Sequence, residues 1–151
     1  MNISICITVK NEERTIGILL GSLLNQTKRP DEIIVVDGGS TDKTIGIINH
    51  YQKKGSYLNL LKEKCSRARG RNLGVEISQN EIIAITDAGC IARPDWLENL
   101  TEPFRNESVG IAAGFYKMVG DTPREKGIAA FLGITPDKFD VNFLPSTRSM
   151  A

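Results

Sequence analysis

The sequence lacks an excess of charge of either sign, and it also lacks any long hydrophobic run. Its 19 Lys and Arg residues nearly balance 18 Asp and Glu residues, which leaves a formal net charge of +1 over 151 residues. This balance gives no general electrostatic reason to bind nucleic acid or an anionic membrane. No apolar stretch approaches the roughly 18 residues that suggest a membrane span. The first ten residues, MNISICITVK, have no basic residue ahead of a short apolar part, so they do not predict a signal peptide.

Cysteine and histidine are scarce. The three cysteines, Cys6, Cys65 and Cys90, form no Cys-x-x-Cys or Cys/His spacing, which argues against a disulfide framework or a structural zinc site. Cys6 lies in an apolar run, where we expect it to pack as a small hydrophobic residue. His50 is the only histidine and has no partner pattern, so a histidine-centred triad is not expected. These features predict a cytoplasmic chain, with any membrane association arising from regions outside it.

Familiar phosphate-binding motifs are also missing. The P-loop pattern GxxxxGK[ST] does not occur, and the turn after the first predicted strand, KNEERT, contains no glycine. The turn therefore does not fit the classical dinucleotide-binding motif. A nucleotidyltransferase would need a glycine- and lysine/arginine-rich loop at this turn. A receiver-like binding module would need an acidic pair where this chain has Lys10 and Asn11.

The sequence does contain a regular alternation of apolar strands and amphipathic helices. Strands are expected over residues 3–9, 33–36, 57–61, 82–86 and 109–119. Helices are expected after caps at Asn11, at Ser40 or Thr41, and at Ser66, then from 94 to about 104 and over 124–132. This alternation indicates right-handed βαβ units in a single α/β domain over residues 1–151, with a mostly parallel sheet flanked by helices.

Two aspartates stand at the carboxyl ends of predicted strands. Asp37 follows the second strand and Asp87 follows the fourth. Ligands of parallel α/β sheets bind outside the carboxyl ends of the strands, so we expect both aspartates at the ligand-binding edge. The Asp37 carboxylate can accept hydrogen bonds from the N–H edge of a nucleobase, or it can accept them from the amides of the following Gly-Gly turn. The local pattern leaves both interpretations open.

A basic stretch, KEKCSRARGRN, covers residues 62–72. On a helix, Arg67 and Arg71 share one face and Arg69 points elsewhere. Guanidinium geometry suits a diphosphate, although most charge runs are simply solvated faces. Trp96 likewise has two interpretations: its ring stacks on a sugar, or it is buried to anchor the helix that begins there.

Four segments in order and at matching spacing resemble the family 2 glycosyltransferases of the GT-A fold. They are ISICITVKNEERTIGILLGSLLNQ, PDEIIVVDGGSTDKT, ARGRNLGVE and EIIAITDAGCIARPDWLENL, and they span approximately residues 2–105. The resemblance implies a Rossmann-like GT-A fold that is incomplete on the acceptor side. It also implies transfer of a sugar from a UDP-linked donor, with inversion, to a saccharide, lipid-linked sugar or protein acceptor. Nucleotide binding without catalysis and nucleotidyl transfer are the alternatives.

The resemblance also implies a set of nucleotide-binding residues. They are Thr8, Val9, Lys10, Glu12, Asp37, Arg71, Asp87 and Ala88. Asp87 begins the family's DxD motif and is the implied ligand of Mg²⁺ or Mn²⁺. Gly89 stands where the family has its usual second acid. Hard divalent cations need several oxygen ligands, so we expect Asp87 alone to hold the cation weakly.

The last residues, FLPSTRSMA, resemble the lead-in to the family's acceptor-binding half, which carries a catalytic acid. Asp137 and Asp140 are the nearest later acids, and neither lies in a matching motif, so no general base is assigned. We therefore expect a nucleotide-binding half with the start of an acceptor half, and no transferase activity from this chain alone.

Overall fold

The computed structural model describes residues 1–55, 57–120, 122–132 and 149–151. The strands are β1 (Ile3–Val9), β2 (Glu32–Asp37), β3 (Leu58–Lys62), β4 (Ile82–Asp87) and β5 (Ser149–Met150). The helices are α1 (Ile16–Leu24), α2 (Thr44–Gln52), α3 (Arg67–Ile77), α4 (Trp96–Thr101), the 3-10 helix η1 (Glu102–Arg105) and α5 (Pro123–Leu132). The expected alternation of strand and helix is confirmed from β1 to α4.

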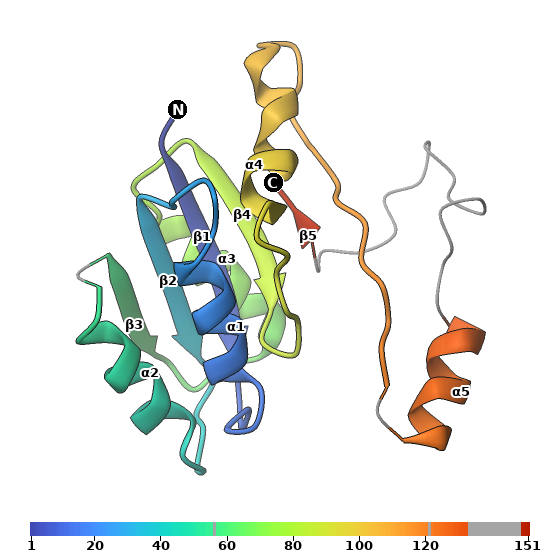
Figure 1. Cartoon of the computed structure of the whole chain (residues 1–151). Helices are drawn as coiled ribbons and strands as arrows, with labels where there is room; N and C mark the ends of the chain where they lie inside the picture. The colour runs from blue at the N-terminus through green and yellow to red at the C-terminus, as the bar shows by residue number, and fades with distance from the viewer. Residues whose placement is uncertain (56, 121, 133–148) are drawn as a thin grey trace.

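The strands form one sheet in the order β3-β2-β1-β4-β5. The first four strands are parallel, and β5 pairs antiparallel with β4. Helices α1 and α2 cover one face of the sheet, and α3 covers the other (Figure 1). The mostly parallel sheet flanked by helices is therefore confirmed.

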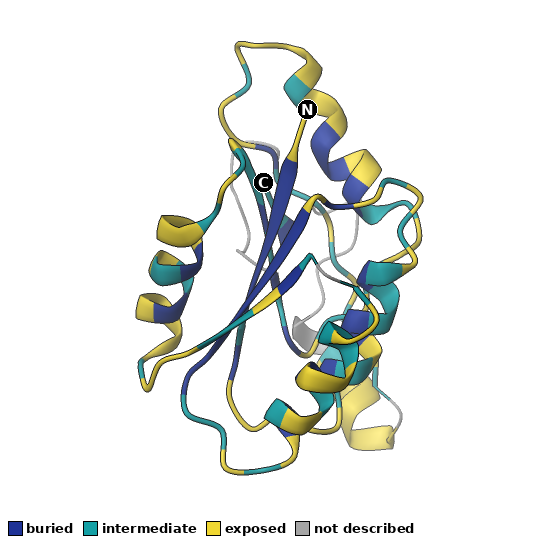
Figure 2. Ribbon diagram, turned by 90° about the vertical axis from the view of Figure 1, so that its left-hand side faces the viewer, coloured by how far each residue is buried: buried dark blue, intermediate teal, exposed yellow. Residues whose placement is uncertain are grey.

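The core lies between the sheet and the helices, whose outer faces are exposed (Figure 2). Every residue of β2 is buried, as is typical of a parallel strand covered on both faces. Helix α1 buries one apolar face against the sheet, made of Ile16, Leu19, Leu20 and Leu23. Burying each such side chain contributes about 1.5–3 kcal/mol, so this face fixes the position of α1.

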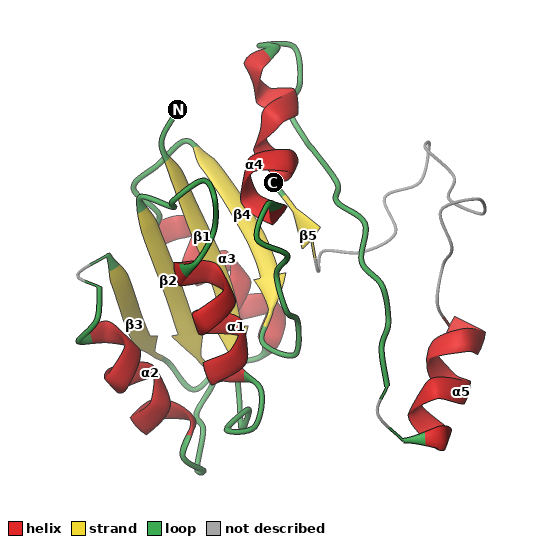
Figure 3. Ribbon diagram, viewed as in Figure 1, coloured by secondary structure: helices red, strands yellow, loops and turns green. Residues whose placement is uncertain are grey.

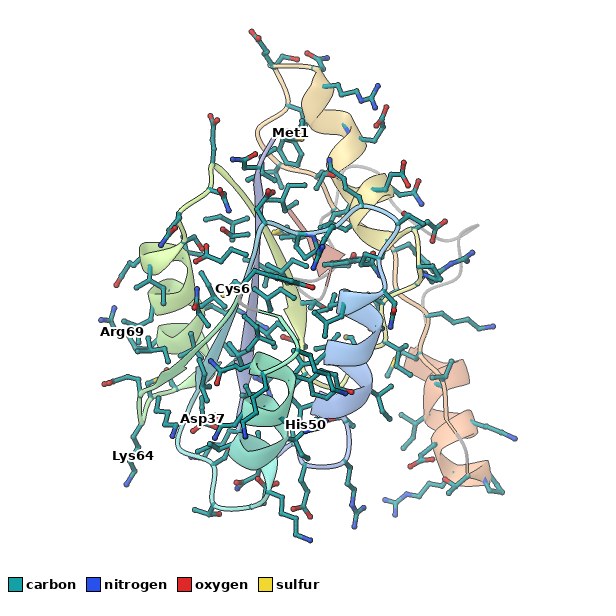
Figure 4. The ribbon with its side chains drawn as sticks, turned by 60° about the vertical axis from the view of Figure 1, so that its left-hand side comes forward. Met1, Cys6, Asp37, His50, Lys64 and Arg69 are labelled. Atoms are coloured by element: carbon teal, nitrogen blue, oxygen red, sulfur yellow. The ribbon has the colours of Figure 1, made fainter. Side chains whose placement is uncertain are left out.

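Helix α3 approaches the sheet closely because two of its buried residues, Gly70 and Gly74, have no side chain. A Cβ atom added to Gly74 would overlap the Sγ atom of Cys6 on β1. Cys6 is fully buried, as predicted, and lies in the interior on the side of α3 (Figure 4). Burial raises the pKa of Cys6 to about 11, although the positive charge of Arg71 lowers it in part.

The strand expected over residues 109–119 is wrong. Most of this segment is an extended loop that leads to α5 (Figure 3), and among the described residues a β-bridge joins Ala113 to Met150. Within the described residues, the partner strand β5 covers Ser149 and Met150. Gly110 and Gly114 also interrupt the segment, and glycine has a low strand propensity.

Two expected helix caps are also wrong. Helices α1 and α2 begin at Ile16 and Thr44, and neither has a side-chain hydrogen bond at its N-cap. The cap expected at Ser66 is confirmed, because its Oγ accepts a hydrogen bond from the Arg69 N–H at 3.3 Å. Helix α5 matches the helix expected over 124–132 and stands away from the sheet (Figure 1).

None of the helices in the described ranges has both the length and the apolar character that crossing a membrane requires.

Candidate functional site

A cavity of about 1210 Å³ lies at the carboxyl ends of β1 and β4. Its walls come from the end of β1, the start of α3, the turn after β4, the region around α4 and the segment 112–119. This volume is above the range of about 300–1,000 Å³ that is typical of small-molecule sites. The cavity therefore has room for an extended ligand at the edge of the sheet where the sequence predicts one.

The end of β1 brings four of the predicted residues to the cavity: Thr8, Val9, Lys10 and Glu12. The parallel register pairs Thr8 with Asp87 on β4 and Val9 with Asp37 on β2. The Oγ1 atom of Thr8 is buried and has no hydrogen-bond partner among the described residues. Buried polar atoms are nearly always paired, so this hydroxyl is a candidate contact for a ligand.

Asp87 and Ala88 line the cavity from the end of β4. The Asp87 Oδ1 atom lies 2.5 Å from an Nη atom of Arg71, in an ion pair whose side chains are 20% and 22% exposed. The Nε atom of Arg71 is buried and has no hydrogen-bond partner among the described residues. Arg71 is not among the residues that line the cavity, so it acts on the cavity through Asp87.

Asp37 is buried and does not line the cavity. Its carboxylate accepts hydrogen bonds from the N–H groups of Gly39 at 3.1 Å and Ser40 at 3.0 Å. Gly39 has a φ of 93°, a conformation that glycine adopts without strain. The structure thus has the interaction expected if Asp37 satisfies turn amides, and Gly38 is the residue of this turn that faces the cavity.

Hydrogen bonds between the loops that follow β1 and β2 replace the expected helix caps. Asn11 has a φ of 53°, its N–H donates to Ser40 Oγ at 2.9 Å, and its Oδ1 accepts from the Thr41 N–H at 2.8 Å. The Glu12 N–H donates to Thr44 Oγ1 at 2.8 Å. Asparagine tolerates this left-handed conformation better than most residues. The loop that carries Glu12 into the cavity is therefore held by its neighbour, and Asn11 does not cap α1.

The start of α3 supplies a residue that the predicted set omits. Arg67 lines the cavity and lies one helical turn before Arg71, so their shared helix face was the signal that could have identified it. Arg69 instead pairs with Glu76 at 3.2 Å, and both side chains are more than half exposed. Figure 4 shows Arg69 on the outer side of α3. The basic stretch therefore divides into one cavity-facing side and one solvated side.

Gly89 lines the cavity directly after Ala88. Its φ is not positive, and a Cβ atom added there would meet no other atom within 4 Å. The described residues contain no group of three or more His, Cys, Asp or Glu side chains that could hold a metal ion. At the end of β4, Asp87 thus offers one carboxylate to a cation, and a cation held there needs further oxygen ligands, such as those of a bound molecule or water.

Trp96 has the packing role that was one of its two interpretations. Its ring packs against the core, and its Nε1–H donates a hydrogen bond to Ser149 Oγ at 2.9 Å. The residue also lines the cavity. Other apolar residues on this side include Ile91, Phe115 and Val119, so this part of the cavity wall is less polar than the end of β1.

The sequence model for glycosyl transferase family 2 matches residues 4–146, nearly the whole chain. The chain belongs to this family. Among curated members, glycosyltransferase AglE of Haloferax volcanii is 31% identical over 116 residues, which cover 74% of this chain. Family 2 membership therefore rests on the sequence.

Solved structures with the same fold include two that hold nucleotides. The S. aureus TarS 1-349 structure in complex with UDP matches 81% of this chain with a TM-score of 0.66 and 22% identity. Mannosyltransferase PcManGT from Pyrobaculum calidifontis, in complex with GDP-Man and Mn²⁺, matches 85% with a TM-score of 0.69 and 25% identity. The expected GT-A fold is thereby confirmed.

The chain spans 38% of the length of each of these three family 2 and GT-A relatives.

Proposed function

We propose that this chain binds a nucleotide-sugar donor, UDP-linked, and serves a glycosyltransferase that transfers the sugar with inversion. The observation that carries the proposal is the cavity at the carboxyl ends of β1 and β4. Thr8–Lys10 line it together with Asp87 and Ala88. Family 2 membership supports the activity, and a GT-A neighbour in complex with UDP supports the class of donor.

In the proposal, the nucleobase of the donor lies at the end of β1, between Thr8–Lys10 and Gly38. The buried Thr8 hydroxyl, which has no partner among the described residues, is available to the base. Asp37 contributes by fixing the turn at Gly38, because its carboxylate already accepts two amide hydrogens of that turn. Contact between Asp37 and the nucleobase, as the resemblance implies, requires this buried carboxylate to become accessible from the cavity.

The diphosphate is assigned to the region between the start of α3 and the end of β4. Arg67 supplies a guanidinium at the cavity wall, and Arg71 orients the Asp87 carboxylate. Charge-assisted hydrogen bonds from a guanidinium suit a diphosphate better than neutral donors do. As the bond between the sugar and the diphosphate breaks, negative charge develops on the diphosphate, and Arg67 stabilises that charge.

A divalent cation, Mg²⁺ or Mn²⁺, is assigned to Asp87 together with the diphosphate oxygens. Such a cation supplies Lewis-acid stabilisation of the leaving phosphate. Since Asp87 is the one acidic side chain at the end of β4, the cation is expected to bind with the nucleotide and not before it. The Mn²⁺ in the complex of PcManGT with GDP-Man supports this assignment.

The acceptor is assigned to the less polar side of the cavity, near segment 112–119. Its hydroxyl attacks the anomeric carbon after losing a proton to a general base. We assign no residue to that base, and Asp137 and Asp140 lie outside the described residues. Saccharides, lipid-linked sugars and proteins are all acceptors that the proposal admits.

Calorimetric titration with UDP, GDP, CDP and ADP, each with and without Mn²⁺, tests the proposal. We expect UDP to bind most tightly and Asp87→Asn to weaken the binding measured with Mn²⁺. Failure of all four diphosphates to bind under either condition would contradict the proposal. Tighter binding of a nucleoside triphosphate, with pyrophosphate release in the presence of a sugar phosphate, would favour nucleotidyl transfer instead.

A further inference from the structure

The three cysteines have very different positions relative to the cavity. All three are free thiols; Cys65 and Cys90 are half-buried and line the cavity, whereas Cys6 is fully buried. The proposed donor chemistry uses none of these sulfur atoms. Two half-buried free cysteines that line the cavity are therefore without an assigned role.

Cys65 lies where the turn after β2 meets the start of α3. Its carbonyl oxygen is 3.1 Å from the position of a Cβ atom added to Gly38, and its Sγ is 3.5 Å from that position on Gly70. Both glycines line the cavity. A group attached to this sulfur would therefore enter the end of the cavity that is assigned to the nucleobase.

Cys90 lies at the turn that follows β4. Its N–H donates a hydrogen bond to the Asp87 carbonyl oxygen at 3.0 Å, which closes the turn through Ala88 and Gly89. A Cβ atom added to Gly89 would meet no atom within 4 Å, so the neighbourhood of this turn has free space. Cys90 itself lines the cavity three residues after Asp87, so a group attached to it would take up space next to the region assigned to the diphosphate.

Cys6 provides an internal reference in the same chain. It lies beneath α3, and its Sγ contacts the region of Gly74 and the Arg71 carbonyl oxygen. Burial holds the pKa of Cys6 near 11, so at neutral pH this thiol is both shielded and protonated. Thiol exchange requires an accessible thiolate, and Cys6 is expected to remain unmodified while the protein is folded.

We propose that Cys65 and Cys90 form a thiol modification site inside the donor cavity, at which a low-molecular-weight disulfide reversibly blocks nucleotide binding. The identity of the blocked ligand, a nucleotide, rests on the proposed function, whereas the modification of the two thiols does not. The physical basis is steric, because each adduct would occupy space that the nucleotide needs.

The modification is a thiol–disulfide exchange. The cysteine thiolate attacks one sulfur of the disulfide, a new S–S bond forms, the old S–S bond breaks, and the other half leaves as a thiolate that takes up a proton. No net oxidant beyond the disulfide is consumed. A thiol reductant reverses the step and releases the cavity.

The test treats the whole chain with glutathione disulfide, locates the adducts by mass spectrometry, and measures UDP affinity before and after treatment. We expect adducts on Cys65 and Cys90 but not on Cys6, and a loss of UDP affinity of at least about tenfold that dithiothreitol restores. Saturating UDP should slow adduct formation. Cys65→Ser and Cys90→Ser, made singly, show which sulfur causes the larger loss.

The matched control is the Cys65→Ser/Cys90→Ser double variant, which should keep its own untreated UDP affinity in the presence of the disulfide. Complete modification of Cys65 and Cys90 with unchanged UDP affinity would overturn the inference, as would the absence of adducts on both residues. If UDP binds to neither the treated nor the untreated protein, the proposed donor is wrong, and protection of the two thiols by the other diphosphates decides whether the site is blocked.

Discussion

At the scale of single residues, Gly89 has the most direct consequence for cation binding. The resemblance to family 2 assigns it to the position of the family's usual second acid, and the structure has no backbone reason for a glycine there. Its φ is not positive, and an added Cβ atom would meet no neighbour. An aspartate therefore fits at this position, within reach of the same cavity as Asp87.

We predict that Gly89→Asp strengthens Mn²⁺ binding roughly tenfold, because it adds a second oxygen donor near Asp87. Little Mn²⁺ should bind to the wild type without UDP, and measurable Mn²⁺ should bind with it. Titration of Mn²⁺ with and without UDP checks both statements. Gly89→Ala is the control, since it adds the same Cβ atom without an oxygen. Unchanged metal affinity with lost UDP binding would mean that the glycine serves backbone geometry and that the cation site proposed at this turn is wrong.

A second prediction for single residues concerns Arg69 and Arg71, which lie on different faces of α3. Arg71→Ala should weaken UDP binding by roughly 1.5–3 kcal/mol, the scale of a charge-assisted hydrogen bond, because it releases the Asp87 carboxylate. Arg69→Ala should change it much less, since Arg69 pairs with Glu76 on the outer side of α3. Calorimetry of both variants makes the comparison. Equal losses would indicate a general effect of positive charge and not a specific effect of the Arg71–Asp87 ion pair.

At the scale of elements, the close packing of α3 on the sheet depends on Gly74. We predict that Gly74→Ala destabilises the fold by about 1–3 kcal/mol, the range of overpacked core substitutions, because the new methyl group overlaps Cys6 Sγ. Removing that sulfur in Gly74→Ala/Cys6→Ala leaves only ordinary contacts, at 3.5 Å to Val36 and 3.6 Å to the Cβ of residue 6. The double variant should therefore be more stable than the sum of the two single changes predicts.

Urea unfolding of the four proteins of this cycle measures the effect. The matched control is Gly46→Ala on α2, where an added Cβ atom would meet nothing within 4 Å. That change should be neutral or slightly stabilising, because alanine has the higher helix propensity. Strict additivity in the cycle would show that α3 adjusts its position, and that the contact between Gly74 and Cys6 does not set the distance between α3 and the sheet.

At the scale of the whole molecule, the buried thiol of Cys6 links stability to pH. Burial raises the pKa of Cys6 from its ordinary value of 9.0 to about 11. The stability that comes from keeping this thiol neutral is therefore complete below pH 9 and is lost as the pH rises through 11. At about 1.4 kcal/mol per pKa unit, the loss is about 3 kcal/mol.

We therefore predict that the free energy of unfolding falls more steeply between pH 9 and 11 in the wild type than in Cys6→Ala. Urea unfolding at several pH values across this interval gives both slopes, and the lysines and tyrosines that titrate in the same interval are common to both proteins. Parallel slopes would show that Cys6 ionises as readily in the folded protein as in the unfolded chain.

The strands and the ligand-binding edge could be predicted from the sequence, because burial and strand ends are encoded locally. β1 was predicted with its observed bounds, and Asp87 lies at the observed end of β4. The starts of α1 and α2 and the conformation of residues 109–119 could not be predicted, since each depends on partners distant along the chain. Asn11 bonds to Ser40, and the extended segment pairs with residues 149–151.

The sequence by itself determined the fold class, the family and the edge of the sheet where the cavity lies. Apolar periodicity and the segments that resemble family 2 are readable without three-dimensional coordinates. Only the tertiary structure decided which polar groups meet one another. It joined Arg71 to Asp87, turned Asp37 toward its own loop amides, and placed Arg67 at the cavity wall. The physical reason is that a polar side chain takes the partner that folding brings within hydrogen-bond distance, and local sequence does not specify that distance.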